Sequence, residues 1–200
     1  MKNIGVLFSG RGSNLFAIKD SIDQGRLDAN MVCAISNRPG IPSIEAAIAR
    51  GIATYSISSK GIAREEHDRE VIKQLRKCDV ELVCLAGYMR LVSAEFCRAF
   101  PDRIVNIHPS LLPAFPGLNA QKQALDHGVK ITGCTVHFVN EELDAGAIIL
   151  QAAIPVCDSD TEESLAARIL KEEHRIYTEA LRIVLSERWH IEGRRVIVDQ

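Results

Sequence analysis

Aromatic residues make up only 5% of this 200-residue chain, and no uninterrupted apolar run approaches the roughly 18 residues that a membrane span requires. A surplus of positive charge is also missing, because 24 Lys and Arg residues face 26 Asp and Glu residues and leave a formal net charge of −2. Without such a surplus we expect no binding to extended nucleic acid. The N-terminus shows no secretion signal, so we expect a cytoplasmic location and no membrane partner.

The chain has six cysteines but no C-x-x-C pair. Cys33, Cys84 and Cys134 lie in apolar, strand-like runs, which is typical of small buried side chains in a reducing compartment. His137 lies three residues after Cys134, but no second close pair completes the four ligands of a zinc site. We therefore expect no metal ion.

Apolar runs and amphipathic segments alternate through the first half of the chain, which predicts βαβ units around a largely parallel sheet. The expected strands are 4–8, 31–35, 54–57, 80–86 and 103–107, and the expected helices are 15–22, 44–49 and 64–76. In the second half, three prolines between positions 106 and 119 predict a structured loop. The elements expected after it are a helix (120–127), two strands (131–139, 147–156), a long helix (161–186) and a hairpin (189–198). Ser159 and Glu162 are a candidate capping box for the long helix.

These elements predict an α/β fold: a single-domain, open, mostly parallel twisted sheet flanked by helices, with a Rossmann-like N-terminal half and antiparallel additions in the C-terminal half. No linker, repeat or low-complexity segment interrupts the chain. We therefore expect one domain over residues 1–200, with halves at 1–100 and 101–200 that share one sheet. A chain of this length buries enough surface to fold without disulfides.

The first candidate site is the turn SGRGSN (9–14) between the first strand and the first helix. Glycines allow a tight turn there, and N–H groups at the start of a helix can bind an anion such as a phosphate. A generic strand-to-helix turn explains the same residues. The third glycine of the dinucleotide fingerprint is missing and no acidic residue ends the second strand, which disfavours NAD and favours a monophosphate.

The second candidate site lies at the carboxyl end of the fifth strand, where open α/β sheets bind their ligands. The Asn106 amide can donate a hydrogen bond to a developing oxyanion, and His108 can transfer a proton or stabilise charge. Pro109 follows directly, and a lone histidine beside a proline is more often structural than catalytic.

Two carboxylates complete the candidates. Asp144 lies in the acidic turn 141–146, and its apolar neighbours favour a partly desolvated carboxylate that can orient an imidazole. Glu173 falls within the apolar stripe of the long helix, where an unpaired charge is costly. Either an ion pair at the edge of the core or a contact with ligand hydroxyls explains this position.

Taken together and in this order, the motifs resemble the folate-dependent glycinamide ribonucleotide (GAR) formyltransferase family of purine biosynthesis. The resemblance covers nearly the whole chain and rests on SGRGSNL (9–15), LAGYMRLV (85–92), NIHPSLLPAFPG (106–117), QAL (123–125) and HFVNEELDAGAIILQ (137–151). It implies transfer of a formyl group from 10-formyltetrahydrofolate to the primary amine of 5-phosphoribosylglycinamide. No metal and no covalent intermediate are implied.

The resemblance also implies individual roles. Asn106 and His108 would stabilise the oxyanion of a tetrahedral intermediate, while Asp144 would hold His108 protonated and help to relay a proton through water. The GAR-binding residues would be Gly12, Ser13 and Asn14 for the phosphate and Glu173 for the ribose. The folate-binding residues would be Arg64, Met89, Arg90, Leu91, Val92, Asn106, Asn140, Glu141 and Asp144. Residues 1–100 would then form the ribonucleotide-binding half and 101–200 the catalytic and folate-binding half.

Two positions depart from the family pattern: Asn119 stands where many members carry a histidine, and Ala147 stands where a proline is common. The first changes a supporting contact near the active site, and the second affects the rigidity of the loop. Two other functions stay open, namely hydrolysis of 10-formyltetrahydrofolate and nucleotide binding without catalysis. We expect a monomer or a homodimer.

Overall fold

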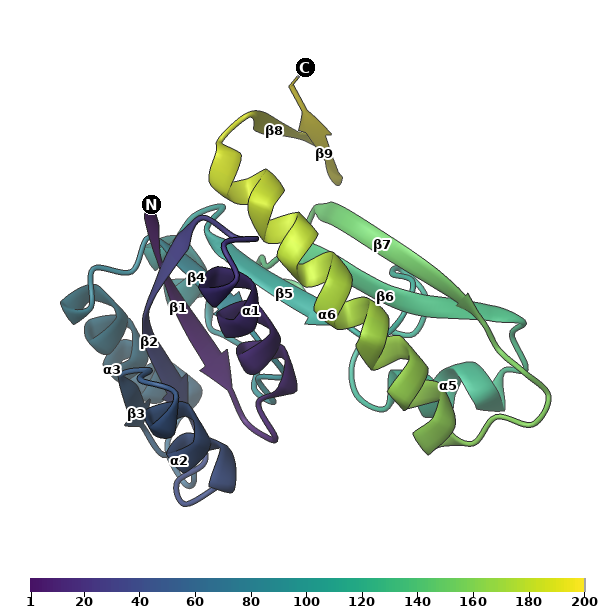
Figure 1. Cartoon of the computed structure of the whole chain (residues 1–200), viewed down its shortest axis with the longest axis horizontal. Coiled ribbons are helices and arrows are strands. Elements are labelled where there is room, and N and C mark those ends of the chain that lie inside the picture. Colours follow the sequence, from purple (N-terminus) through teal and green to yellow (C-terminus); the bar gives the residue numbers. More distant parts are fainter. Residues whose placement is uncertain (200) are drawn as a thin grey trace. The chain divides into compact units, whose positions relative to one another are not determined.

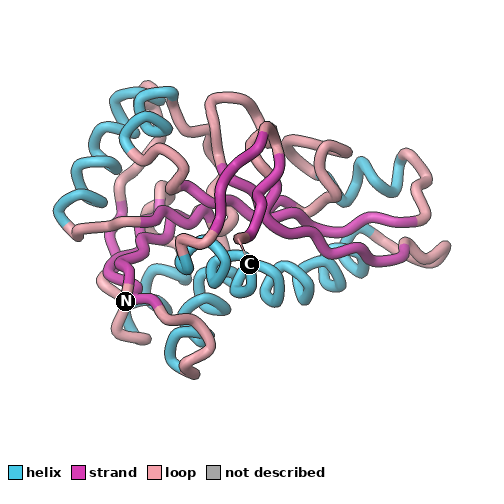
Figure 2. Tube along the Cα trace, turned by 90° about the horizontal axis from the view of Figure 1, so that it is seen from above, coloured by secondary structure: helices cyan, strands magenta, loops and turns pink. Residues whose placement is uncertain are grey.

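The computed structural model describes residues 1–199, and its contacts divide the chain into two compact units, unit 1 (Met1–Asn106) and unit 2 (Ile107–Gln200). Unit 1 contains β1 (Lys2–Phe8), α1 (Ser13–Asp23), β2 (Ala29–Ser36), α2 (Pro42–Ala49), β3 (Thr54–Ser56), α3 (Arg64–Lys77), β4 (Leu82–Leu85) and α4 (Ala94–Ala99), and β5 (Ile104–His108) runs across the boundary (Figure 1). The parallel strands follow the order β3-β2-β1-β4-β5. Helices lie on both faces of this sheet (Figure 2).

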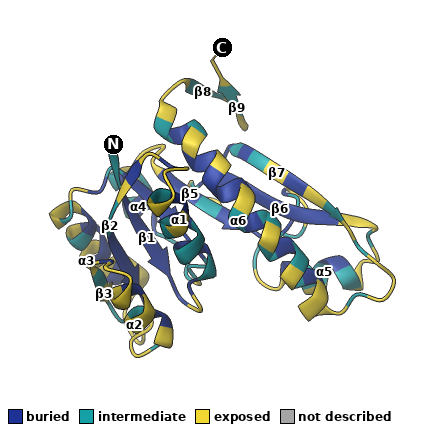
Figure 3. Ribbon diagram, viewed as in Figure 1, coloured by how far each residue is buried: buried dark blue, intermediate teal, exposed yellow. Residues whose placement is uncertain are grey.

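The sequence of β1 explains why helices cover both faces. Its side chains from Ile4 to Phe8 are fully buried at every non-glycine position, and the strand is dark blue in Figure 3. Because consecutive side chains point to opposite faces of a strand, such burial requires a helix layer on each side. A Cβ on Gly5 would lie 2.8 Å from side-chain atoms of both Leu75 and Val80, so the end of α3 packs directly on β1.

Unit 2 contains α5 (Ala120–Asp126), β6 (Ile131–Phe138), β7 (Ile148–Pro155), α6 (Glu162–Ser186), β8 (Trp189–Glu192) and β9 (Arg195–Val198). β6 and β7 are antiparallel, β9 joins β7 in parallel through Ile148 and Arg195, and β8 and β9 form an antiparallel hairpin. α6 packs along β6 and β7 and buries one apolar stripe, while its opposite face is exposed (Figure 3). None of the helices within residues 1–199 is long and apolar enough to cross a membrane.

The α/β class, the parallel sheet and the antiparallel additions confirm the prediction. The predicted capping box was wrong. Thr161 is the N-cap residue of α6: its Oγ1 accepts from the Ser164 N–H at 3.2 Å, and the Ser164 Oγ accepts from the Thr161 N–H at 3.0 Å. Ser159 lies outside the helix because the Cys157 N–H donates to the Asp160 carboxylate at 2.7 Å and closes a turn before the helix.

Candidate active site

The structure brings His108 and Asp144 together within unit 2. His108 ends β5, Asp144 lies in the loop before β7, and the His108 Nδ1 is 3.4 Å from the Asp144 Oδ2. The two side chains are only 6% and 10% exposed. The His108 Nε2 is 2.8 Å from the carbonyl oxygen of Phe115. A carbonyl only accepts, so Nε2 carries a proton and Nδ1 faces the carboxylate.

Asp144 is held in place by its backbone surroundings. The Gly117 N–H donates to the Asp144 Oδ2 at 2.8 Å, so the loop after β5 and the loop before β7 are joined at the carboxylate. Asp144 itself has φ 49°, a left-handed conformation that costs free energy for a residue with a side chain. The partial burial expected from the apolar neighbours of Asp144 is confirmed.

A second histidine, His137 in β6, also faces this carboxylate, with its Nε2 3.7 Å from the Asp144 Oδ1. Its Nδ1–H donates to the carbonyl oxygen of Phe138 at 2.8 Å. Burial lowers the pKa of His137, which leaves the ring neutral at pH 7 and its Nε2 unprotonated. From the sequence, His137 is only a weakly supported zinc ligand. Its place in the HFVNEELDAG segment, seven residues before Asp144, is the one signal that points to the site.

The loop after β5 is fixed by side chains from β6 and β7. The Thr135 hydroxyl donates to the Ser110 carbonyl oxygen at 2.7 Å and accepts from the Leu112 N–H at 3.0 Å. The Gln151 amide donates to the Leu112 carbonyl oxygen and to the Thr135 Oγ1, both at 2.9 Å. These bonds fix the segment that carries Phe115, and they confirm that the proline-rich loop is structured.

Asn106 lies in the same strand as His108 and is half-buried. β5 remains a strand up to His108, so residues 106 and 108 project from the same face of β5. In the sheet Asn106 is opposite Leu85 of β4.

The predicted phosphate turn follows β1. Gly12 has φ 74° and is the N-cap residue of α1, and no side chain caps this helix. The first turn of α1 contains no acidic residue, so no carboxylate there offsets the positive partial charge at the helix start. A Cβ at position 12 would lie 3.2 Å from the Phe16 ring, so both this close contact and the backbone conformation favour glycine at this position.

Ser9, the first residue of the candidate turn 9–14, directly follows β1 and has a role that the sequence does not indicate. Its Oγ donates to the Asn37 Oδ1 at 2.6 Å and accepts from the Met89 N–H at 2.7 Å, and its own N–H donates to the Gly87 carbonyl oxygen at 3.1 Å. One hydroxyl therefore joins the ends of β1 and β2 to the predicted folate segment 89–92. A serine in a turn is too common to be recognised as such a link from the sequence.

The predicted folate segment 89–92 of unit 1 has exposed side chains, and hydrogen bonds to other parts of the unit hold it in place. Met89 and Leu91 are 58% and 52% exposed, while the Arg90 guanidinium donates to the Ile62 carbonyl oxygen at 3.1 Å. Val92 is half-buried, and the next residue, Ser93, donates its N–H to the buried Asp68 carboxylate at 2.6 Å. Arg64 lies at the exposed start of α3 and pairs with Glu65 at 3.6 Å.

In unit 2, Asn140 and Glu141 are exposed, and the Asn140 Oδ1 accepts from the Glu142 N–H at 3.1 Å. How these residues and those of unit 1 act on one ligand stays a prediction. Asn119 is the exposed N-cap residue of α5 with φ 56°, a conformation that asparagine tolerates better than most residues.

Glu173 is on the buried face of α6 with 8% exposure, as its place in the apolar stripe predicted. Burial and the charge of Glu173 raise the pKa of the Cys134 thiol in β6 to about 12, so this carboxylate lies near the strand that carries Cys134. The expected contact with a ribose stays a prediction.

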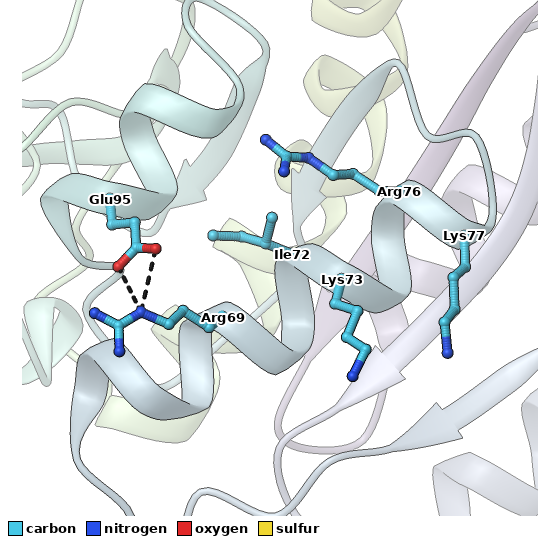
Figure 4. Close-up of a pocket in the computed structure, with 6 residues that line it drawn as sticks. All are labelled: Arg69, Ile72, Lys73, Arg76, Lys77 and Glu95. Atoms are coloured by element: carbon cyan, nitrogen blue, oxygen red, sulfur yellow. Dashed lines mark hydrogen bonds and ion pairs between the residues drawn. The ribbon is translucent and has the colours of Figure 1, made fainter.

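A cavity of about 460 Å³ opens on unit 1 along α3, and it contains none of these candidate residues (Figure 4). Its lining is Arg69, Ile72, Lys73, Arg76, Lys77 and Glu95, and the Arg69 Nε donates to both Glu95 oxygens at 3.2 and 2.9 Å. The candidate active site is therefore defined by its chemistry and not by this cavity. Residues 1–199 contain no group of three or more His, Cys, Asp or Glu side chains placed to hold a metal ion.

Comparison with known proteins shows which family this chain resembles. The formyl transferase family model matches residues 2–181. The trifunctional purine biosynthetic protein adenosine-3 of Drosophila melanogaster is 48% identical over 92% of this chain, which spans only 14% of that protein. The phosphoribosylglycinamide formyltransferase of Escherichia coli (strain K12) is 42% identical over 96% of this chain and 88% of its own length.

Among solved structures, glycinamide ribonucleotide transformylase 1 from Symbiobacterium toebii has a TM-score of 0.97 at 51% identity, covering 100% of this chain and 95% of that chain. A formyltetrahydrofolate deformylase from Pseudomonas syringae pv. tomato has a TM-score of 0.92 at 28% identity, and the match covers 100% of this chain and 66% of the deformylase.

Proposed function

The chain belongs to the formyl transferase family, and on that premise we propose that it transfers a formyl group from 10-formyltetrahydrofolate to the amine of GAR, giving formyl-GAR and tetrahydrofolate in purine biosynthesis. The observation that carries the proposal is the buried pair of His108 and Asp144, 3.4 Å apart at the carboxyl end of β5. The family accounts for the reaction, and this pair accounts for how the chain performs it.

His108 acts as a cation in the proposed mechanism. Its two ring nitrogens face the Asp144 carboxylate at 3.4 Å and the Phe115 carbonyl oxygen at 2.8 Å. An imidazolium donates from both nitrogens and so satisfies both acceptors. When the amine attacks the formyl carbon, its oxygen becomes an oxyanion, which the imidazolium charge and the Asn106 amide stabilise.

Asp144 orients His108 and takes part in the removal of the amine proton. The distance of 3.7 Å between its Oδ1 and the His137 Nε2 is longer than a hydrogen bond, which leaves this oxygen able to accept from a bridging water. The proton released by the attacking amine passes through such a water to the carboxylate. When the oxyanion collapses, the bond between the formyl carbon and the folate nitrogen breaks, and this nitrogen takes up a proton through the same water to give tetrahydrofolate. The Gly117 N–H, at 2.8 Å, keeps the carboxylate in position during the transfer.

The substrates are assigned to the residues that the family resemblance indicated. Gly12, Ser13 and Asn14 bind the phosphate, supported by the start of α1 that no side chain caps, and Glu173 binds the ribose hydroxyls. The folate is bound by Arg64, Met89, Arg90, Leu91, Val92, Asn106, Asn140, Glu141 and Asp144. Exposed apolar side chains at 89 and 91 suit a flat heterocycle, and the protein acts as a monomer or homodimer.

Hydrolysis of 10-formyltetrahydrofolate is the second candidate, because a deformylase shares the fold with a TM-score of 0.92. The experiment incubates the purified chain with 10-formyltetrahydrofolate, with and without GAR, and measures formyl-GAR, formate and tetrahydrofolate by mass spectrometry. We expect tetrahydrofolate to appear only with GAR and in equal amount to formyl-GAR. Formate release without GAR would identify a hydrolase, and GAR binding without turnover would identify a binding module.

A further inference from the structure

Two cysteines that are far apart in the sequence meet at the C-terminal end of α3 in unit 1. Cys33 lies in β2 and is fully buried, whereas Cys78 is the C-cap residue of α3 and is half-buried. Burial raises the pKa of the Cys33 thiol, and the neighbouring Cys78 thiol raises that pKa further. The formyl transfer mechanism uses neither residue, so the contact needs another account.

The backbone brings together the two segments that carry these cysteines. Cys33 is opposite Gly5 of β1 in the parallel pairing, and opposite residues of neighbouring strands point to the same face. A Cβ on Gly5 would lie 2.8 Å from Leu75 and from Val80, which flank the end of α3. The turn that carries Cys78 therefore lies directly over the Gly5–Cys33 pair.

Cys78 is the member of the pair that a small oxidant can reach. The Gln74 Nε2 donates to its sulfur at 3.4 Å, and Cys78 raises the pKa of the neighbouring Tyr55 hydroxyl, which belongs to a residue that is 38% exposed. The thiolate is the nucleophilic form of a cysteine, and Cys78 is the more accessible of the two cysteines. Cys33 differs, because burial and the neighbouring Cys78 raise the pKa of its thiol.

We propose that Cys33 and Cys78 are an oxidisable dithiol that hydrogen peroxide converts into a disulfide between β2 and the end of α3. The Cys78 thiolate attacks one peroxide oxygen, the O–O bond breaks, and the departing hydroxide takes up a proton to become water. The Cys33 sulfur then attacks the Cys78 sulfur, the S–O bond breaks, and the Cys33 proton leaves with that oxygen as a second water. Two thiols lose two electrons in total and the peroxide gains them.

The test treats the folded full-length protein with hydrogen peroxide, blocks free thiols with N-ethylmaleimide and identifies tryptic peptides by mass spectrometry. We expect a peptide 27–50 linked to peptide 78–90, a loss of about 2 Da from the intact mass, and reversal by dithiothreitol. The oxidised protein should also have a higher Tm than the reduced protein, because the bond constrains the unfolded chain.

Cys84→Ser is the matched control, since Cys84 lies in the same tryptic peptide as Cys78 and is buried. The link should persist in Cys84→Ser and disappear in Cys78→Ser, with both variants keeping the native circular dichroism spectrum. Oxidation of Cys78 to a sulfinic acid without a link in the folded protein would overturn the proposal. A link that forms only in urea, or that persists in Cys78→Ser, would overturn it as well.

Discussion

Replacing Asp144 with asparagine removes the negative charge beside His108 and keeps the shape of the side chain. At the observed 3.4 Å, and with the effective dielectric constant of about 20 that describes protein sites, a carboxylate stabilises an imidazolium by about 5 kcal/mol. With only 10% of the Asp144 side chain exposed, water screens this interaction little. If the imidazolium charge acts in the transition state, kcat should fall by roughly a few thousandfold.

The fold should survive this substitution. The Gly117 N–H, which donates to the Asp144 Oδ2 at 2.8 Å, finds an amide oxygen in asparagine at the same place. The assay measures kcat for GAR-dependent formyl transfer at saturating substrates, together with the Tm. Glu142→Gln is the matched control, because it removes an exposed carboxylate from the same loop, and its kcat should stay within about twofold of wild type. A native Tm with kcat within tenfold of wild type would refute the reasoning.

Three further predictions concern Glu173, His137 and Gly146. Glu173→Gln should raise the KM for GAR by about tenfold or more with little change in kcat, since a ribose contact binds ground state and transition state alike; an unchanged KM would assign Glu173 to an ion pair of the core. Burial lowers the pKa of His137 below 6.5, so as the pH drops the unfolded chain binds the proton before the folded one and the free energy of unfolding decreases below pH 6.5. In urea unfolding, His137→Asn should therefore show a shallower dependence of the free energy of unfolding on pH in this range. An unchanged pH dependence would exclude His137 as its origin. Gly146→Ala should lower the Tm far more than Gly193→Ala, because a Cβ at 146 would lie 1.8 Å from the Phe138 carbonyl oxygen while one at 193 meets nothing within 4 Å; equal losses would contradict the close approach.

The sequence predicts best the helices and strands that have either a continuous apolar run or a long amphipathic pattern. β1 is a continuous apolar run, and α6 repeats its apolar residues at helical spacing over Glu162–Ser186. α4, Ala94–Ala99, was not predicted, because it is short and its main signal is the Ser93 hydroxyl that accepts from the Phe96 N–H at 3.2 Å. A single capping residue gives too little pattern for a prediction.

The candidate site shows the same limit. Asp144 could be singled out because apolar residues surround it in the chain, and its neighbour His108 because it ends a strand. His67 and Asp68 are buried at 1% exposure within α3, whose other residues are mostly charged, and no sequence pattern distinguishes these two from the exposed ones. Only the fold shows that Asp68 accepts from the Ser93 N–H and so supports the predicted folate segment.

The central claim is that His108 and Asp144 act as one catalytic unit in formyl transfer to GAR. The direct measurement is kcat for wild type, His108→Ala, Asp144→Asn and the double variant, with native folding verified in each. Residues that act as a unit are not additive, so the double variant should be no slower than the slower single variant within about twofold. If the two single losses multiply in the double variant, or if His108→Ala retains wild-type turnover, the claim is contradicted.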